Sequence, residues 1–182
     1  MLAIVSRLVK PKGMDLIAHV LEELMALGVQ LVVLGTGEER YESLFRVAAH
    51  RHAGALSANI YFDDQLARRI YAASDIFLMP SQFEPCGIGQ LIAMRYGSLP
   101  LVRETGGLKD TVTAYNEATG EGNGFSFTNY NAHDMLYTIE RAVKLYHDQE
   151  LWSGLVKKAM RQDYSWSSSA KHYVQLYQKV SR

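Results

Sequence analysis

Short apolar runs alternate with longer amphipathic stretches along the first part of the chain. Five runs are only four or five residues long and are rich in β-branched and bulky apolar side chains. Runs of this kind, with no polar residue at alternate positions, are typical of strands that are buried on both faces of a parallel sheet. We therefore predict strands at 2–5, 30–34, 59–62, 75–79 and 99–102.

The stretches between these runs have helical periodicity. In 14–27 the apolar residues form one stripe, and Gly28 follows as a helix stop. Further helices are predicted at 38–50, 64–73 (with Tyr71 facing inward) and 87–96, the last ended by Gly97. An alternating βαβ order favours right-handed crossovers and a doubly wound parallel sheet. The fold class predicted is α/β, Rossmann-like.

The pattern changes after Val112. A polar, Gly-rich loop at 116–124 precedes a short run at 125–127, which predicts an edge strand. Helical patterns then dominate at 131–147, 148–160 and 167–180. Because there are no internal repeats or low-complexity tracts, we interpret 1–182 as a single α/β domain with C-terminal helices.

Composition excludes several classes of protein. The 182 residues carry 19 Lys plus Arg and 19 Asp plus Glu, so no basic footprint for nucleic acid or membrane surfaces is present. No apolar run approaches the ~18 residues that span a bilayer. One cysteine, Cys86, leaves no internal disulfide and fits a reducing compartment. These features are typical of a cytosolic protein.

Candidate chemistry gathers in the loops that follow the predicted strands. In an open parallel sheet, ligands bind beyond the carboxyl ends of the strands. The first such loop places Arg7 and Lys12 on either side of Pro11, just before a predicted helix start. Two cations, free amides and the positive end of a helix dipole form an anion site. The alternative is an ordinary solvated basic loop.

The second loop contains Gly35-Thr36-Gly37. It lacks the third glycine of a dinucleotide fingerprint, because Arg40 stands at that position. The segment is still typical of a tight turn at which a ligand ring approaches the backbone.

The fourth loop carries the strongest signal. Glu84 lies between Phe83 and Pro85, shortly before the helix predicted from Gly87. We expect the amides of Cys86, Gly87, Ile88 and Gly89 to be free donors beside this carboxylate, which suits sugar hydroxyls and phosphate oxygens together. The alternatives are that Glu84 only caps the helix and that Cys86 is a buried structural thiol.

Two other groups of residues are weaker candidates. Thr105-Gly106 opens a further helix in a turn that suits phosphate or ribose. Asp63 and Asp64 are expected to cap a helix rather than to bind metal. The six histidines have no ligand spacing, so no metal site is predicted.

Taken together, these segments resemble the C-terminal domain of bacterial glycogen synthase and plant starch synthase, over essentially the whole chain. The matching motifs are Ser6-Arg7-Leu8-x-x-x-Lys12-Gly13, Gly35-Thr36-Gly37, Pro80-Ser81-x-Phe83-Glu84-Pro85-Cys86-Gly87-x-x-Gln90-Leu91, Tyr96-Gly97-x-Leu99-Pro100, Thr105-Gly106-Gly107-Leu108-x-Asp110-Thr111-Val112, Tyr164-Ser165-Trp166 and Ala170-x-x-Tyr173-x-x-Leu176-Tyr177. Many other retaining transferases of the GT-B fold have a second glutamate seven residues after the first. Leu91 stands there in this chain, which favours the glycogen and starch synthase group.

The resemblance implies the C-terminal half of a two-domain GT-B enzyme that transfers glucose from ADP-glucose to the non-reducing end of an α-1,4-glucan with retention. It implies that Arg7 and Lys12 hold the diphosphate and that Glu84, with the amides of Cys86 and Gly87, binds the glucose hydroxyls. The amides of Ile88 and Gly89 would face the phosphates, and Gln90 belongs to the same segment. Phe62 falls where the family usually stacks a tyrosine on adenine, and Gly89 where a threonine is common. No cofactor besides the ADP-glucose or ADP ligand is implied.

The acceptor-binding N-terminal domain of that family is absent from this sequence. We therefore expect a donor-binding domain that is inactive alone and meets glucan only through the missing domain. Around Tyr173 and Tyr177 we expect an exposed apolar patch, with possible dimerisation as a consequence.

Two alternatives remain open. One is a GT-B transferase that uses a UDP-sugar, and the other is a non-catalytic nucleotide-binding α/β domain. An NAD-binding module is a weaker third, because the glycine fingerprint is incomplete and no acidic residue ends the second strand.

Overall fold

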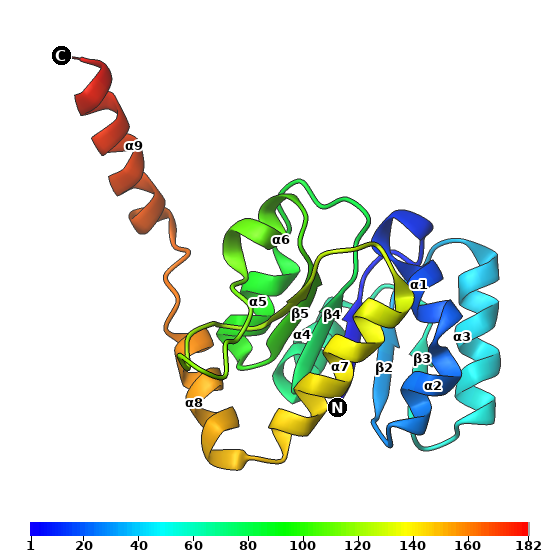
Figure 1. Cartoon of the computed structure of the whole chain (residues 1–182). Coiled ribbons are helices and arrows are strands. Elements are labelled where there is room, and N and C mark those ends of the chain that lie inside the picture. Colours follow the sequence, from blue (N-terminus) through cyan, green and yellow to red (C-terminus); the bar gives the residue numbers. More distant parts are fainter. Residues whose placement is uncertain (182) are drawn as a thin grey trace.

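The computed structural model describes residues 1–181 and contains a parallel sheet flanked by helices (Figure 1). The sheet has six strands in the order β3-β2-β1-β4-β5-β6. Each neighbouring pair is parallel, which confirms the doubly wound sheet. The strands are β1 (Leu2–Val5), β2 (Leu31–Leu34), β3 (Leu56–Asn59), β4 (Ile76–Met79), β5 (Leu99–Arg103) and β6 (Phe125–Phe127).

Helices cover both faces of this sheet. Along β1, Leu2 and Ile4 belong to one apolar cluster and Ala3 to another, because alternate residues of a strand point to opposite faces. The first face is covered by α1 (Met14–His19), α2 (Leu21–Ala26), α3 (Glu39–Arg51), α7 (Ala132–Tyr146) and α8 (Gln149–Met160). The second is covered by α4 (Asp64–Ala73) and α5 (Gly89–Tyr96), and α6 (Gly106–Thr111) packs beside them.

The strand order reverses between β1 and β4. From β1 the chain proceeds outward to β2 and β3, whereas β4, β5 and β6 extend in the other direction. At such a switch point the loops after the two central strands diverge and leave a crevice at their carboxyl ends. The loops that carry Arg7, Lys12 and Glu84 are these two loops.

Three sequence predictions were wrong in their boundaries. The third strand is 56–59 rather than 59–62, so Tyr61 and Phe62 lie in the loop after it. The helix expected at 14–27 is two helices, because Val20 leaves helical geometry with φ −116° and ψ 20°. The fourth helix begins at Gly89, two residues later than expected, and Gly97 ends it as predicted with φ 86°.

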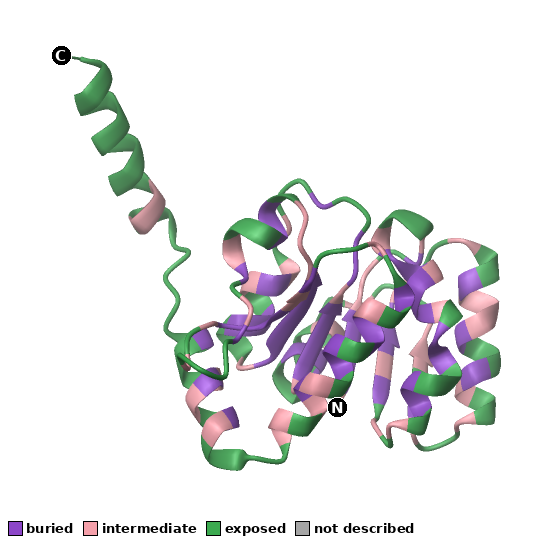
Figure 2. Cartoon of the chain, in the orientation of Figure 1, coloured by how far each residue is buried: buried purple, intermediate pink, exposed green. Residues whose placement is uncertain are grey.

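The C-terminal part follows the expectations closely. β6 is an edge strand beside β5, and the side chains of Asn131 and Asp148 cap α7 and α8. The last helix, α9 (Trp166–Val180), projects away from the sheet at the end of an extended linker (Figure 1). None of its residues is buried, and Figure 2 shows the helix almost entirely in the colour of exposed residues. An exposed apolar patch was predicted there, and Tyr173 and Tyr177 are 57% and 65% exposed.

Candidate functional site

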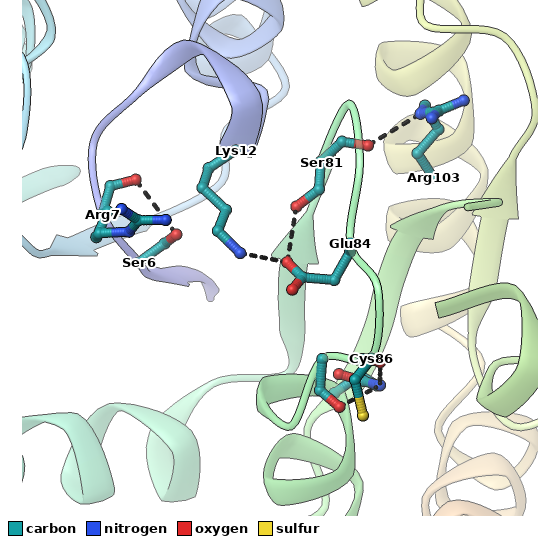
Figure 3. A network of polar contacts seen from close by, with 9 residues as sticks. Ser6, Arg7, Lys12, Ser81, Glu84, Cys86 and Arg103 are labelled. Atoms are coloured by element: carbon teal, nitrogen blue, oxygen red, sulfur yellow. Dashed lines mark hydrogen bonds and ion pairs between the residues drawn. The ribbon is translucent and has the colours of Figure 1, made fainter. Parts of the chain in front are cut away.

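The loop after β1 and the loop after β4 lie against each other at the switch point (Figure 3). The Gln82 amide donates to the Pro11 carbonyl oxygen over 2.9 Å. Gly13 has φ 79°, and a Cβ atom there would lie 2.1 Å from the Pro80 carbonyl oxygen. Only glycine therefore allows the two loops this close. The contact fixes the position of Lys12 relative to Glu84.

Lys12 and Glu84 form an ion pair across these loops. Lys12 Nζ donates to Glu84 Oε2, and the Ser81 hydroxyl donates to the same oxygen over 3.3 Å. Glu84 is only 8% exposed, and partners of this kind replace the hydration that a carboxylate loses on burial. Its second oxygen, Oε1, accepts no hydrogen bond from residues 1–181. The carboxylate thus keeps one oxygen for a ligand hydroxyl.

A cleft of about 400 Å³ opens beside this pair. Arg7 and Lys12 come to it from the first loop, Ser81 and Glu84 from the fourth. The other lining residues come from the end of β1, from β4, from α1 and α4, and from α5 and the segment that leads into it. They are Val5, Ser6, Met14, Tyr71, Leu78, Met79, Gly87, Ile88, Gly89 and Ile92.

The segment before α5 presents backbone donors to this cleft. Gly87 has φ 73°, and the helix starts at Gly89 after Ile88. Within residues 1–181, the amides of Cys86, Gly87, Ile88 and Gly89 donate to no acceptor. Free amides at a helix N-terminus attract anions. Gly87, Ile88 and Gly89 line the cleft together with Glu84, so a carboxylate and free amides border the same space.

A second cavity of about 350 Å³ adjoins the first. Both are lined by Val5, Ser6, Arg7, Tyr71 and Ile92, so Arg7 stands where they join. Gly35 and Thr36 form one side of the second cavity, and Phe62, which is 85% exposed, forms its rim. This mainly apolar cavity suits a planar ring next to a polar, cation-bearing cleft.

Several predicted site residues do not line either cavity. These are Gly37, Cys86, Gln90, Thr105 and Gly106. Their direct contact with a ligand stays a prediction. The Cys86 thiol is exposed, so the structure contradicts the alternative of a buried structural thiol. Asp63 caps α4 by accepting from the Leu66 amide over 2.9 Å, as expected.

The residues away from the cavities shape the loops instead. Gly37 approaches the backbone of Leu8, where a Cβ atom would lie 2.2 Å from the carbonyl oxygen. Gln90 is fully buried, and its Nε2 donates to the Gly87 carbonyl oxygen and to the Thr111 hydroxyl, each over 3.1 Å. Gly106 packs on the Glu84 backbone, which fixes the loop from behind.

Sequence reasoning missed a brace formed by Arg103 and Tyr130. Arg103 donates to the carbonyl oxygens of Ser81 and Gln82, and its guanidinium lies 5.7 Å from the centre of the Tyr130 ring. The Tyr130 hydroxyl donates to Asp15 at the start of α1 and lies 3.2 Å from the Lys10 carbonyl oxygen. Burial, followed by the contact with Asp15, raises the pKa of Tyr130. The two residues hold both site loops, and no motif in the sequence marks them.

Among residues 1–181, no group of three or more His, Cys, Asp or Glu side chains is arranged to hold a metal ion. In the same part of the chain, no helix has the length and apolar character that crossing a bilayer requires.

The sequence and fold of this chain are similar to those of known proteins. A family model described as "Glycosyl transferases group 1" matches residues 1–160. The glycogen synthase of Clostridium novyi (strain NT) is 61% identical over 180 residues, which cover 99% of this chain and 38% of the relative. The glycogen synthase of Clostridium acetobutylicum is 62% identical over 181 residues, again 99% of this chain and 38% of the relative.

A solved structure is similar over the full chain. The catalytic domain of starch synthase IV from Arabidopsis thaliana, bound to ADP and acarbose, superposes with a TM-score of 0.87 and 40% sequence identity. The match covers 100% of this chain and 38% of that structure. The chain thus spans well under half the length of each of these relatives.

Proposed function

This chain belongs to the group 1 glycosyl transferases, and on that premise we propose that it is the ADP-glucose-binding domain of a glycogen or starch synthase. The whole enzyme would transfer glucose to the non-reducing end of an α-1,4-glucan with retention of anomeric configuration. The chain spans 38% of its glycogen synthase relatives, so turnover is assigned to the longer protein and not to residues 1–182 alone.

One observation carries the proposal: the Lys12–Glu84 ion pair and Arg7 share a cleft that continues into a ring-sized cavity. In this proposal, adenine occupies the second cavity against Phe62, beside Gly35 and Thr36. The diphosphate lies at the junction, where Arg7 is shared by both cavities. Glucose then reaches the unpaired oxygen of Glu84.

These residues would lower the barrier by electrostatics. When the bond between the anomeric carbon and the diphosphate oxygen breaks, the electron pair stays with ADP. The cations Arg7 and Lys12, with the free amides before α5, neutralise that developing charge in a partly buried site. Glu84 binds sugar hydroxyls and holds Lys12 in place, and no metal ion is needed for the step.

Binding of ADP to the 182-residue chain tests this proposal. Saturation at ~100 times Kd adds roughly 2.7 kcal/mol of stability, which raises Tm by roughly 5–10 °C for a chain of this size. We expect ADP to give this shift and UDP a smaller one. A larger shift with UDP would assign the site to a UDP-sugar enzyme, and no shift with either would support a non-catalytic domain.

Turnover provides the second arm of the test. With radiolabelled ADP-glucose and glycogen, we expect no elongation by the chain alone, because the glucan acceptor would bind the part of the relatives that this chain does not span. Elongation by residues 1–182 would refute this. The cytoplasmic or plastid location and a dimer of the chain remain parts of the same proposal.

A further inference from the structure

Tyr71 is a buried aromatic residue whose hydroxyl belongs to the ligand site. It lies on α4, is 7% exposed, and its ring packs at 4.7 Å from that of Phe77. By these criteria it is an ordinary core residue. It also lines both cavities, a property that it shares with only four other residues of 1–181.

The Tyr71 hydroxyl has no hydrogen-bond partner among the residues that the structure describes, 1–181. Gln90 Oε1 is the one fully buried side-chain nitrogen or oxygen atom in that range that lacks a hydrogen-bond partner. The unpaired Tyr71 hydroxyl oxygen is therefore still accessible to solvent. Buried tyrosine hydroxyls usually find a partner, since an unpaired one loses its hydration without compensation. The hydroxyl therefore opens onto the cavities with its hydrogen-bonding capacity unused.

Gly89 leaves the space in front of this hydroxyl open. A Cβ atom on Gly89 would lie 3.4 Å from the Tyr71 hydroxyl oxygen and 3.2 Å from the Phe77 ring. The backbone at Gly89 is not left-handed, so conformation alone does not require glycine at this position. The missing side chain instead lets a ligand at the start of α5 reach Tyr71.

Besides the Tyr71 hydroxyl, several groups around this junction are donors that have no acceptor in residues 1–181. Arg7 supplies a cation to both cavities, and the amides of Ile88 and Gly89 have no acceptor. Burial raises the pKa of Tyr71 to about 12, so the phenol keeps its proton and is a donor at neutral pH. Such a set suits a ligand that only accepts hydrogen bonds and carries negative charge.

We propose that Tyr71 is a further substrate-binding residue, whose hydroxyl donates to a diphosphate oxygen of the nucleotide through the space that Gly89 leaves open. This inference rests on the proposed function and assigns a new contact within that site. The ribose, which both donates and accepts hydrogen bonds, fits a set of donors less well.

The test measures binding of ADP and of adenosine to the 182-residue chain by calorimetry or NMR titration. Tyr71→Phe removes only the hydroxyl, and we expect it to weaken ADP binding about 10-fold, as loss of one hydrogen bond to a charged group does. Adenosine, which has no phosphate, should bind both proteins equally. The matched control is Tyr96→Phe, because Tyr96 stacks on Tyr71 at 6.3 Å and lines neither cavity.

Gly89→Ala gives a second, independent variant. Its methyl group would occupy the approach to the hydroxyl, so ADP should bind more weakly, and Tyr71→Phe should add little further loss in the double variant. If Tyr71→Phe weakened ADP binding equally in the unaltered chain and in Gly89→Ala, the proposal that the ligand reaches Tyr71 through the space at Gly89 would be overturned. The ratio of the ADP affinity to the adenosine affinity tests the phosphate contact even if a variant lowers Tm, because a reduced folded fraction weakens the binding of both ligands alike.

The outcomes separate the two proposals. If the unaltered chain binds no ADP, the proposed function and this contact both fail. If it binds ADP and Tyr71→Phe binds equally well, the proposed function stands and the Tyr71 contact is refuted. If adenosine binding falls as much as ADP binding, the ratio of the two affinities is unchanged and the phosphate assignment is wrong.

Discussion

Arg103 Nε lies 2.9 Å from the carbonyl oxygen of Ser81 and donates to it. Because the guanidinium also donates to Gln82 and rests on the Tyr130 ring, one side chain fixes the loop from which Glu84 projects. The position of the loop is thus fixed by contacts within the chain itself.

The first prediction concerns this arginine. Arg103→Lys keeps the charge and loses the planar fork, so it cannot reproduce both carbonyl contacts and the contact with the ring. We expect ADP to bind several-fold more weakly to Arg103→Lys, with a loss of about 1–2 kcal/mol in the free energy of unfolding. Urea unfolding and ADP calorimetry measure the two effects. Arg40→Lys, at an exposed arginine on α3, is the control. Equal losses of stability and of ADP affinity in the two variants would contradict the role of Arg103 in holding the loop.

The second prediction concerns the close approach of the two site loops. Gly13 and Gly28 have similar φ values, 79° and 71°. A Cβ atom meets Pro80 backbone at 2.1 Å in the first case and nothing within 4 Å in the second. Gly28→Ala should therefore cost only the backbone strain, about 1 kcal/mol. Gly13→Ala should cost clearly more and abolish ADP binding; thermal unfolding of the pair checks this, and equal Tm values would be evidence against loop contact.

The arrangement of the sheet was predictable because its strands are continuous apolar runs. The exception is instructive: the 56–59 strand reads Leu-Ser-Ala-Asn, with no β-branched residue, whereas the nearby Tyr61 and Phe62 are typical strand residues. Pairing of Leu31 with Leu56 fixes the register, and the two aromatic residues remain outside it. Tertiary pairing outweighs local propensity here.

Phe62 is the subject of the third prediction. Its ring is largely exposed at the rim of the second cavity, so it has little to stabilise in the empty protein. Phe62→Ala should leave Tm unchanged and make the free energy of ADP binding less favourable by about 1–2 kcal/mol. This is the lower part of the range for stacking of one base. Phe62→Tyr should restore binding. Unchanged ADP affinity in Phe62→Ala, measured by calorimetry, would place adenine elsewhere.

A fourth prediction separates the partners of the central ion pair. Glu84→Gln keeps the shape and removes the charge that holds Lys12, while ADP lacks the glucosyl group that would contact residue 84. We expect Glu84→Gln to bind ADP at least as well as the unaltered chain and to lose any preference for ADP-glucose over ADP. Lys12→Met should weaken the binding of both ADP and ADP-glucose and reduce the salt dependence of that binding, because it removes a phosphate-facing cation. Parallel calorimetry at two salt concentrations measures this, and a selective loss of ADP with Glu84→Gln would contradict the roles given to the pair.

The candidate site was predictable where chemistry coincides with a strand end. Arg7, Lys12 and Glu84 follow β1 and β4, and the switch point brings them together. Tyr71 and Arg103 escaped notice for a different reason. Tyr71 belongs to the apolar stripe of α4 and Arg103 ends β5, so only three-dimensional contacts show that one opens onto the cavities and the other holds a loop.

The last prediction concerns the linker and α9. Trp166, Tyr173 and Tyr177 are all more than half exposed, so the helix buries almost no apolar surface on the rest of the chain. An isolated helix of ~15 residues is only marginally stable in water. The chain shortened to residues 1–165 should therefore keep its Tm and its ADP affinity. If apolar α9 surfaces cause association, the shortened chain should also be the more monomeric of the two by sedimentation.

Tyr164 supplies the contrast for this experiment. Its hydroxyl donates to the Thr111 carbonyl oxygen over 2.8 Å and receives a bond from Asn123, so it ties the linker to the end of α6 and to the loop that follows. Shortening the chain to residues 1–163 removes this contact as well and should cost about 1 kcal/mol of stability. A large loss of Tm already at 1–165 would mean that α9 packs on the sheet in solution, and the extended position of the helix would then be wrong.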